Sequence, residues 1–220
     1  MKNFLKLFLG ISGLHLLLLL FGLDNYAVFT KPLLLICLLM AVLSAADFKT
    51  KPLLLIALLF SWLGDVLLIF TDRAELFFIL GLVSFLISHV FYFVLFYKQA
   101  SSKALNPKLF GLGIVITLVY LLTFLTLILP YLGALKLPVV VYGLVISIML
   151  AAAIRGALIW KPKANFLILF GAIWFVASDS LLAFNKFYNE FAFAGFLIMI
   201  TYLAAQYFIT RGLLRLNDAD

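Results

Sequence analysis

Residues 109–130 read LFGLGIVITLVYLLTFLTLILP and contain no charged side chain. A run of this length matches the ~20 apolar residues that an α-helix needs to cross the ~30 Å hydrocarbon core of a bilayer. Apolar runs of 10 to 14 residues are more typical of buried helices in soluble proteins. The segment therefore predicts a membrane-spanning helix, and similar runs recur along the chain.

The composition extends this prediction to the whole chain. Of the 220 residues, 67% are hydrophobic and 11% are charged, and the mean hydropathy is +1.26. Soluble domains average nearly half apolar and about a quarter charged residues, so lipid must surround much of this surface. The length suits one integral membrane domain over residues 1–220, with no room for a substantial soluble domain.

Short breaks that carry charged residues or proline separate eight apolar runs, at residues 4–23, 32–46, 52–70, 76–97, 109–130, 138–160, 165–184 and 191–210. Backbone groups in lipid must be hydrogen-bonded within their segment, and the alternation of barrel strands is absent. We therefore expect an all-α, polytopic membrane protein. The second run is the shortest and could extend back to Tyr26. Prolines lie at or near four expected helix starts, where a missing N–H costs little: Pro32, Pro52, Pro138 and Pro162.

Lysine and arginine are distributed unequally between the two sets of loops. One side carries twelve of the 16: Lys2, Lys6, Lys49, Lys51, Lys98, Lys103, Lys108, Arg155, Lys161, Lys163, Arg211 and Arg215. The other side carries four: Lys31, Arg73, Lys136 and Lys186. The positive-inside rule then places both termini in the cytoplasm, in a bacterial-type inner membrane. The net charge of +7 comes from these loops, so we expect no nucleic-acid binding. The first run lacks a small-residue cleavage site, which predicts a retained helix.

Two aspartates lie well inside the expected spans. Asp65 follows Gly64 in the third run, and Asp179 follows Ser178 in the seventh. Both runs cross in the same direction, and each aspartate lies about five residues before its end, or roughly 7–8 Å at 1.5 Å per residue. The other carboxylates lie in loops, at helix ends or in the tail: Asp24, Asp47, Asp72, Glu75, Glu190, Asp218 and Asp220.

A carboxylate at membrane depth costs some ~2.5–3.5 kcal/mol on insertion scales and usually faces a cavity or a partner. If the two aspartates converge, repulsion and desolvation keep one of them protonated beside an ionised neighbour. Such a pair cleaves acetals through oxocarbenium-like states. The structural alternative is that each aspartate only caps or pairs with Ser61, Ser178 or Lys186.

His89 lies in the fourth run with Tyr92 one turn later, about 20 Å from the outer boundary and thus deeper than the aspartates. It either relays protons or contacts substrate, or it only packs through hydrogen bonds. A zinc site built from His89, Asp65 and Asp179 is conceivable. The single cysteine, Cys37, excludes an intrachain disulfide and a thiolate cluster. We expect no bound metal and no cofactor.

An ordered set of residues also resembles a known family. It comprises Lys31-Pro32, Gly64-Asp65-x-x-Leu68, Gly81, Phe85, His89-x-x-Tyr92, Gly171-Ala172, Phe175, Ser178-Asp179 and Ala183-x-Asn185-x-Phe187. This set spans nearly the whole chain and resembles the lysoplasmalogenase (YhhN-like) family. The resemblance implies an eight-helix membrane hydrolase that cleaves the vinyl ether bond of a lysophospholipid into a fatty aldehyde and a glycerophospho-base. It also implies that Asp65 and Asp179 are catalytic and that no cofactor is needed.

Three classes of function stay open. In the hydrolase hypothesis, Lys31, Lys136 or Lys186 would meet the lipid phosphate at the outer rim, and Asn185 would bind a head group or cap a helix. A proton-coupled transporter of small solutes would also use intramembrane carboxylates and a histidine. A purely structural protein would leave two costly aspartates unexplained. The sequence does not indicate an oligomeric state.

Overall fold

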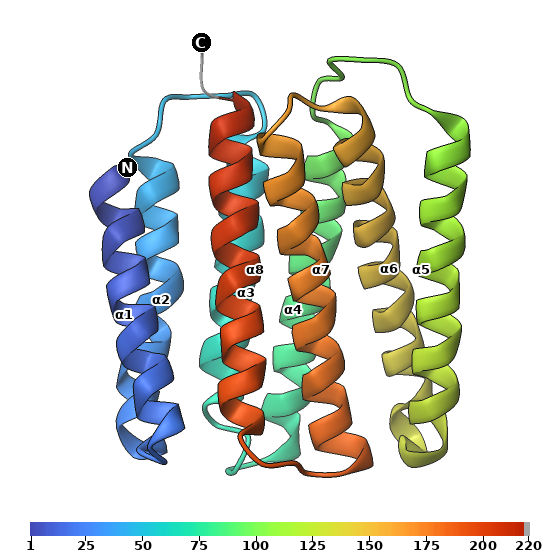
Figure 1. Ribbon diagram of the computed structural model, residues 1–220. Helices are drawn as coiled ribbons and strands as arrows, with labels where there is room; N and C mark the ends of the chain where they lie inside the picture. Colours follow the sequence, from blue (N-terminus) through green and yellow to red (C-terminus); the bar gives the residue numbers. More distant parts are fainter. Residues whose placement is uncertain (218–220) are drawn as a thin grey trace. The chain divides into compact units, whose positions relative to one another are not determined.

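The computed structural model describes residues 1–217 (Figure 1). Within them the chain forms eight long helices: α1 (Lys2–Leu20), α2 (Asp24–Leu43), α3 (Lys51–Leu68), α4 (Glu75–Tyr97), α5 (Pro107–Ile128), α6 (Lys136–Ile159), α7 (Ala164–Ala183) and α8 (Ala194–Asn217). The short turns are η1 (Leu129–Tyr131) and η2 (Gly133–Leu135), both 3₁₀, and the π-helical η3 (Phe184–Tyr188). All eight long helices are long and apolar enough to cross a membrane, which confirms the predicted all-α, polytopic class.

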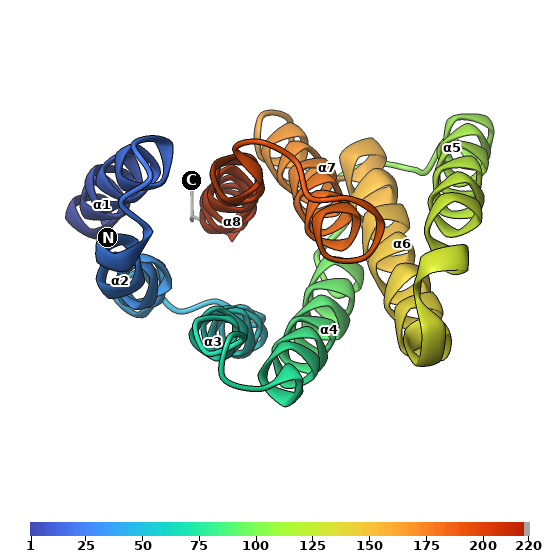
Figure 2. The same cartoon turned by 90° about the horizontal axis from the view of Figure 1, so that it is seen from below.

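The helices form two compact units, Met1–Leu95 and the chain from Phe96 onward, so the last residues of α4 belong to the second unit. In the first unit, α2 packs against α1 and α3. In the second unit, α6 packs against α5 and α7, and α7 packs against α8 (Figure 2). Neighbours in the chain are thus neighbours in space within each unit, as short connections favour. A single membrane domain over residues 1–220 stays a prediction.

Two glycines allow α3 and α4 to approach closely. A Cβ on Gly64 would lie 2.7 Å from Cε2 of Phe85, and a Cβ on Gly81 would lie 2.8 Å from Cδ2 of Leu68. Lipid tails are as apolar as leucine, so helix association in a membrane depends on such close packing and on interhelical hydrogen bonds. These residues of the family-like set therefore act in packing.

The contact between α7 and α8 brings backbone against backbone. A Cβ on Gly171 would lie 2.8 Å from the backbone nitrogen of Ile209 and 2.9 Å from the carbonyl oxygen of Ala205. Gly212 on α8 makes a similar close approach to α7, because a Cβ there would lie 3.1 Å from the backbone nitrogen of Ile168. These glycines fix the position of α7, which carries Asp179.

The second helix differs most from its prediction. It begins at Asp24, two residues before the Tyr26 to which the run could extend, so Pro32 lies inside α2, and the prediction that this proline marks a helix start is wrong. Pro32 removes only the hydrogen bond that the Val28 carbonyl would accept, and its own carbonyl accepts one from Nε1 of Trp62 at 2.9 Å. Lys31, expected in a loop, is a helical residue that is partly buried. The other three prolines lie near helix starts, as predicted: Pro52 and Pro138 are in the first turns of α3 and α6, and Pro162 lies two residues before α7.

The last helix continues to Asn217 rather than ending at Thr210. The added turns carry Arg211 and Arg215, whose long side chains can reach the membrane interface while the backbone stays helical. The remaining helix ends differ from the expected ones by at most three residues. Asp218 and Asp220, which we expect in the tail, lie outside the described residues.

Candidate functional site

Asp65 is buried near the end of α3 in the first unit, with 2% of its surface exposed. Lys31 on α2 is near enough for the charge of Asp65 to act on its ammonium group. The hydrogen bond from Trp62 to Pro32 ties this stretch of α2 to α3, one turn before Asp65. The cost of a buried carboxylate is thereby reduced by a nearby positive charge.

Ser61, predicted as a supporting residue, belongs to the contact between α3 and α4. The Oγ of Ser88 donates to the carbonyl of Ala57 at 2.8 Å and lies 2.7 Å from the Oγ of Ser61. A hydroxyl has one hydrogen, so Ser61 must be the donor to Ser88. The hydroxyl hydrogen of Ser61 therefore points to α4, and it does not cap Asp65.

His89 and Tyr92 are both completely buried on α4. The bond between Ser61 and Ser88 shows that these two residues lie at the same height along α3 and α4. Asp65 lies one turn after Ser61, about 6 Å nearer to the end of α3. His89 follows Ser88 and thus lies deeper than Asp65, as expected, but by only about 7–8 Å along the axis rather than the roughly 12 Å expected from the sequence. A relay or substrate-contact role for His89 stays a prediction.

Asp179 is held by a tyrosine that the sequence reasoning missed. The hydroxyl of Tyr142 on α6 donates to Oδ2 of Asp179 on α7 at 2.6 Å, and both residues are partly buried. A hydrogen bond to a carboxylate oxygen is roughly twice as strong as one between neutral groups. The orientation of Asp179 is therefore set from α6. A survey of tyrosines inside the spans would have found Tyr142, which lies near the start of α6 as Asp179 lies near the end of α7.

A second tyrosine bridges α5 and α7 beside this pair. Ser180 donates to the carbonyl of Val176 at 2.7 Å, so Tyr120 must be the donor in the 2.8 Å bond between the hydroxyls of Tyr120 and Ser180. Tyr120 therefore bonds to the side chain of Ser180, the residue after Asp179. Both tyrosines donate a hydrogen bond to α7, Tyr142 to Asp179 and Tyr120 to Ser180.

Aromatic rings line the helix ends that follow Asp179. Phe124 on α5 stacks on Tyr120 at 6.1 Å between ring centroids and meets Phe184 of η3 edge-on at 5.8 Å. Tyr188 packs against Phe184 at 6.0 Å and against Tyr131 at 4.8 Å. The carboxylate of the second unit thus lies next to an apolar, aromatic neighbourhood of the kind that accommodates hydrocarbon.

Three further candidates lie on or near η3. Ser178 donates to the carbonyl of Ile198 on α8 at 3.0 Å, so its hydroxyl hydrogen does not cap Asp179. Asn185 accepts a hydrogen bond from the backbone nitrogen of Phe191 at 3.4 Å, which closes the turn into α8. Lys186 is exposed.

Each unit therefore holds one of the two aspartates that lie well inside a span: the first has Asp65 near Lys31, and the second has Asp179 bonded to Tyr142. The convergence of the two carboxylates stays a prediction. Within residues 1–217, no three His, Cys, Asp or Glu side chains gather as a candidate metal site.

Comparisons with known proteins identify the family. The profile of the YhhN family matches residues 26–213, a range that contains Asp65 and Asp179. The chain is 32% identical over 155 residues to a protein of Mus musculus named lysoplasmalogenase TMEM86B, which covers 70% of this chain and 60% of the relative. The Rattus norvegicus protein of that name is also 32% identical, over 70% of this chain and 58% of the relative.

A Homo sapiens protein named lysoplasmalogenase TMEM86A is 31% identical over 153 residues, which is 67% of this chain and 59% of the relative. The chain thus spans about 60% of the length of these curated relatives. No solved structure matches it. The match to the profile covers most of the sequence, and the chain is a multi-pass integral membrane protein that belongs to the YhhN family.

Proposed function

We propose that this protein hydrolyses the vinyl ether bond of lysoplasmalogen-type lysophospholipids and releases a fatty aldehyde and a glycerophospho-base. The observation that carries the proposal is the similarity to proteins named lysoplasmalogenase, in a chain with two carboxylates well inside its membrane-spanning helices. The comparisons give no support to a proton-coupled carrier. A lipid substrate also suits an enzyme whose helices are surrounded by lipid, and we expect its membrane to be a bacterial-type inner membrane.

The reaction needs an acid and a group that stabilises a cation. A carboxylic acid gives its proton to the β-carbon of the vinyl ether, where the double-bond electrons form the new C–H bond, and the carbon next to oxygen becomes an oxocarbenium ion. Water adds to this carbon and gives a proton to the carboxylate. The bond between the hemiacetal carbon and the glycerol oxygen then breaks. The hemiacetal hydroxyl loses its proton and becomes the aldehyde carbonyl, while the glycerol oxygen gains a proton and leaves as the alcohol. One water is consumed, and no oxidant is needed.

We assign the two carboxylate roles to Asp65 and Asp179, one as proton donor and the other as stabiliser of the cation. Tyr142 is then a positioning residue, because it holds one oxygen of Asp179 at 2.6 Å. Lys31 adds a positive charge beside Asp65 that suits the phosphate of the lipid. The aromatic rings from Tyr120 to Tyr188 supply apolar surface for the alkyl chain.

Matched lysolipids test the proposal. The purified full chain is incubated with three lysophospholipids that share head group and chain length and differ in an alkenyl, alkyl or acyl linkage. Only the alkenyl lipid has double-bond electrons that accept a proton, so we expect aldehyde from that lipid alone. An absence of aldehyde from the alkenyl lipid would contradict the proposal.

Heavy water tests the chemical step. Protonation at carbon places one solvent hydrogen on carbon 2 of the aldehyde, so turnover in D₂O should give aldehyde with one deuterium there. Free aldehyde incubated without protein measures exchange after the reaction. Aldehyde that carries no more deuterium than this control would exclude protonation at carbon.

A further inference from the structure

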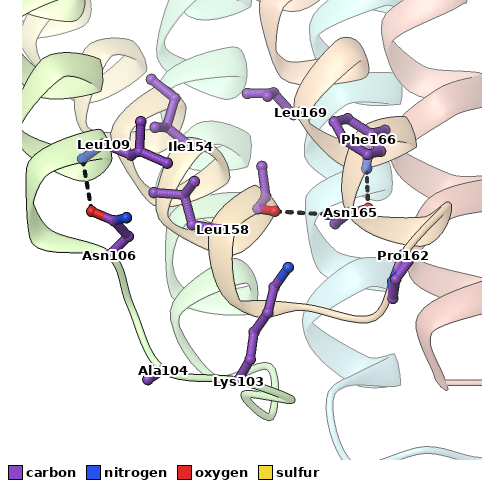
Figure 3. A pocket seen from close by; sticks show the side chains of 11 residues that line it. Lys103, Ala104, Asn106, Leu109, Ile154, Leu158, Pro162, Asn165, Phe166 and Leu169 are labelled. Carbon is purple, nitrogen blue, oxygen red and sulfur yellow. Dashed lines mark hydrogen bonds between the residues drawn. The ribbon is translucent and has the colours of Figure 1, made fainter.

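The second unit contains a pocket of about 500 Å³ at the end where α5 begins, α6 ends and α7 begins. This volume lies within the range of sites that bind small molecules, about 300–1,000 Å³. Its walls are mostly apolar and come from all three helices: Leu109, Ile154, Leu158, Phe166 and Leu169 (Figure 3). Its inner part includes Ile154, which packs against α5 where a Cβ on Gly113 would lie 2.5 Å away.

Hydrogen bonds hold the framework of this pocket. The backbone nitrogens of Ser102 and Lys103 donate to the carbonyl of Ile159 at 2.7 and 3.3 Å, which fixes the loop before α5 to the end of α6. Asn165, 3% exposed, donates from Nδ2 to the carbonyl of Ala157 at 2.7 Å and joins α7 to α6 (Figure 3). The pocket is therefore built by bonds between its walls.

One charged side chain lines the pocket. Lys103 extends from the loop toward the space between Leu158 and Asn165 (Figure 3). The other polar lining residue near the loop, Asn106, uses its side-chain oxygen to cap α5 through the nitrogens of Lys108 and Leu109, at 3.1 and 3.2 Å. The ammonium of Lys103 is thus the charge that a ligand in this pocket would meet.

The stretch of sequence that builds the pocket carries only positive charge. No Asp or Glu occurs between Glu75 and Asp179, whereas that stretch carries six basic residues at this end of its helices: Lys98, Lys103, Lys108, Arg155, Lys161 and Lys163. Basic pockets between membrane helices bind the head groups of anionic lipids, and each Lys or Arg near a membrane surface contributes about 1 kcal/mol to such attraction. The positive charge of these residues therefore favours an anionic group at the mouth of the pocket.

The apolar walls of the pocket indicate that the ligand also has an apolar part. Leu109 is 51% exposed and Phe166 is 67% exposed, so the rim of the pocket offers apolar side chains to the surrounding lipid. Leu169 lies five residues into α7, or about 7–8 Å along the helix axis. A glycerophospholipid fits both features, with its phosphate at Lys103 and the start of an acyl chain along the apolar walls.

We propose that this pocket binds an anionic diacyl glycerophospholipid at a site separate from Asp179. Leu169 and Asp179 are ten residues apart on α7, or about 15 Å, so a head group held at Lys103 lies at the opposite end of that helix from the Asp179 carboxylate. The bound lipid bridges α5, α6 and α7 and stabilises the unit that carries Asp179. This site goes beyond the proposed hydrolysis.

Native mass spectrometry of the purified full chain tests the site. Phosphatidylglycerol and phosphatidylcholine with identical acyl chains are added separately in a neutral detergent, without lysolipid substrate. We expect preferential binding of phosphatidylglycerol and a higher melting temperature with it. Lys103→Gln should weaken its apparent Kd about fivefold. Lys49→Gln makes the same charge change on an exposed lysine just before α3, outside the pocket, and should leave the Kd unchanged.

A second pair of variants tests the apolar walls. Leu109→Trp places a large ring in the mouth at an exposed position, and should abolish the preference for phosphatidylglycerol. Leu112→Trp adds the same ring to α5 at a residue that is 57% exposed and outside the pocket lining, and should preserve it. Equal binding of the two lipids, equal effects of the two lysine variants, or equal stabilisation by glycerol phosphate without acyl chains would each overturn the proposal. These readouts are independent of aldehyde release.

Discussion

The hydroxyl of Tyr142 donates a 2.6 Å hydrogen bond to Oδ2 of Asp179 and thereby links α6 to α7 at the aspartate. Tyr120 makes a comparable 2.8 Å bond from α5, but its acceptor is the hydroxyl of Ser180, the next residue. The chain thus offers two tyrosines near one carboxylate, of which one bonds to the carboxylate and the other to its neighbour. This pair separates an effect on the carboxylate from an effect on helix packing.

Tyr142→Phe keeps the ring and removes the hydroxyl. A hydrogen bond to a charged group contributes about 1.5–3 kcal/mol, so loss of this positioning bond should lower kcat about 10- to 150-fold if Asp179 acts in the reaction. The measurement is aldehyde release from an alkenyl lysolipid at saturating substrate. KM should change little, because Tyr142 is proposed to act on Asp179 rather than on the substrate.

Tyr120→Phe is the matched control for that variant. It removes a hydroxyl that bonds to Ser180, so kcat should stay within about twofold of the original value while the melting temperature falls slightly. If both variants lower kcat equally, Tyr142 acts only in packing, and its assignment as a positioning residue is wrong.

The helices were predictable because the hydrocarbon core offers no hydrogen-bond partners. The backbone of an apolar span must therefore bond within its own segment, as an α-helix does. The start of α2 was not predictable, because Lys31 and Pro32 together have the composition of a helix start. The structure explains the difference: the charge of Lys31 is near Asp65, and the Pro32 carbonyl has a second donor in Trp62. Asp65 and Trp62 both lie on α3. The sequence alone does not show which side chains of α3 face Lys31 and Pro32.

The aspartates could be singled out because a carboxylate in lipid has a large and specific cost. Tyr142 could not be singled out in this way, since a tyrosine hydroxyl costs far less to bury and many tyrosines only pack. The serines show the same limit. Ser61 and Ser178 lie next to the aspartates in the sequence, yet their hydrogens go to Ser88 and to the carbonyl of Ile198. Hydroxyl direction depends on tertiary contacts.

Gly171→Ala should destabilise the second unit. The new methyl group would lie within 2.8–2.9 Å of backbone atoms of Ile209 and Ala205, which cannot move without separating α7 from α8. Overpacking of this kind costs about 1–3 kcal/mol, which corresponds to a fall in melting temperature of roughly 2–12 °C for a chain of this size. The measurement is thermal unfolding followed by tryptophan fluorescence.

Gly111→Ala is the control for that substitution, because a Cβ there meets no atom within 4 Å. Alanine has the higher helix propensity by about 1 kcal/mol, so this variant should unfold at the same or a slightly higher temperature. Equal destabilisation of the two variants would mean that the α7–α8 contact is looser than the distances imply.

Lys51→Met should destabilise the first unit at the connection between α2 and α3. The ammonium of Lys51 donates to the carbonyls of Leu43 and Ala45, at 3.2 and 2.8 Å, and to Asp47 at 2.9 Å. Methionine keeps an apolar stem and removes all three bonds, and the expected loss of about 1–2 kcal/mol lowers the melting temperature by roughly 2–8 °C. Lys49→Met, at an exposed position, should leave it unchanged.

The same network predicts a small dependence of stability on pH. The hydrogen bond from Lys51, together with its charge, holds the pKa of Asp47 below its usual value. A carboxylate whose pKa is lower in the folded state stabilises the protein above its unfolded pKa, and this contribution is lost as pH falls through the folded pKa. Asp47→Asn should therefore unfold slightly earlier than the original protein at pH 7, and the difference should shrink below about pH 4 and vanish once the pH is below the folded pKa.

Reporter fusions test the orientation that the lysine and arginine count predicts. A fusion in the loop at residues 98–106 and a fusion after Asp220 should both read as cytoplasmic, because both belong to the side with twelve basic residues. A fusion at residues 189–193 should read as periplasmic. A periplasmic signal from both of the first two fusions would reverse the orientation, and opposite signals from them would contradict the helix count.

Asp65→Asn and Asp179→Asn test whether the aspartates perform chemistry. The amide keeps the size of the side chain and removes the ionisable group, so each variant should lower turnover by at least the ~10²-fold typical of a lost proton-transfer group. The yield of folded protein should change little, because an amide costs less to bury than a carboxylate. Aldehyde release per folded molecule and the melting temperature are both measured.

The two explanations for these residues predict opposite patterns. If Asp65 and Asp179 only pair with their neighbours, their asparagine variants should lose yield or thermal stability and keep normal turnover per folded molecule. Asp72→Asn makes the same change at an exposed residue between α3 and α4, and should affect neither turnover nor stability at pH 7. His89→Gln should be milder than either variant if the buried histidine only packs. Near-normal aldehyde release from both aspartate variants would exclude the two-carboxylate mechanism. The proposed specificity for the vinyl ether bond is tested separately by the three matched lysolipids.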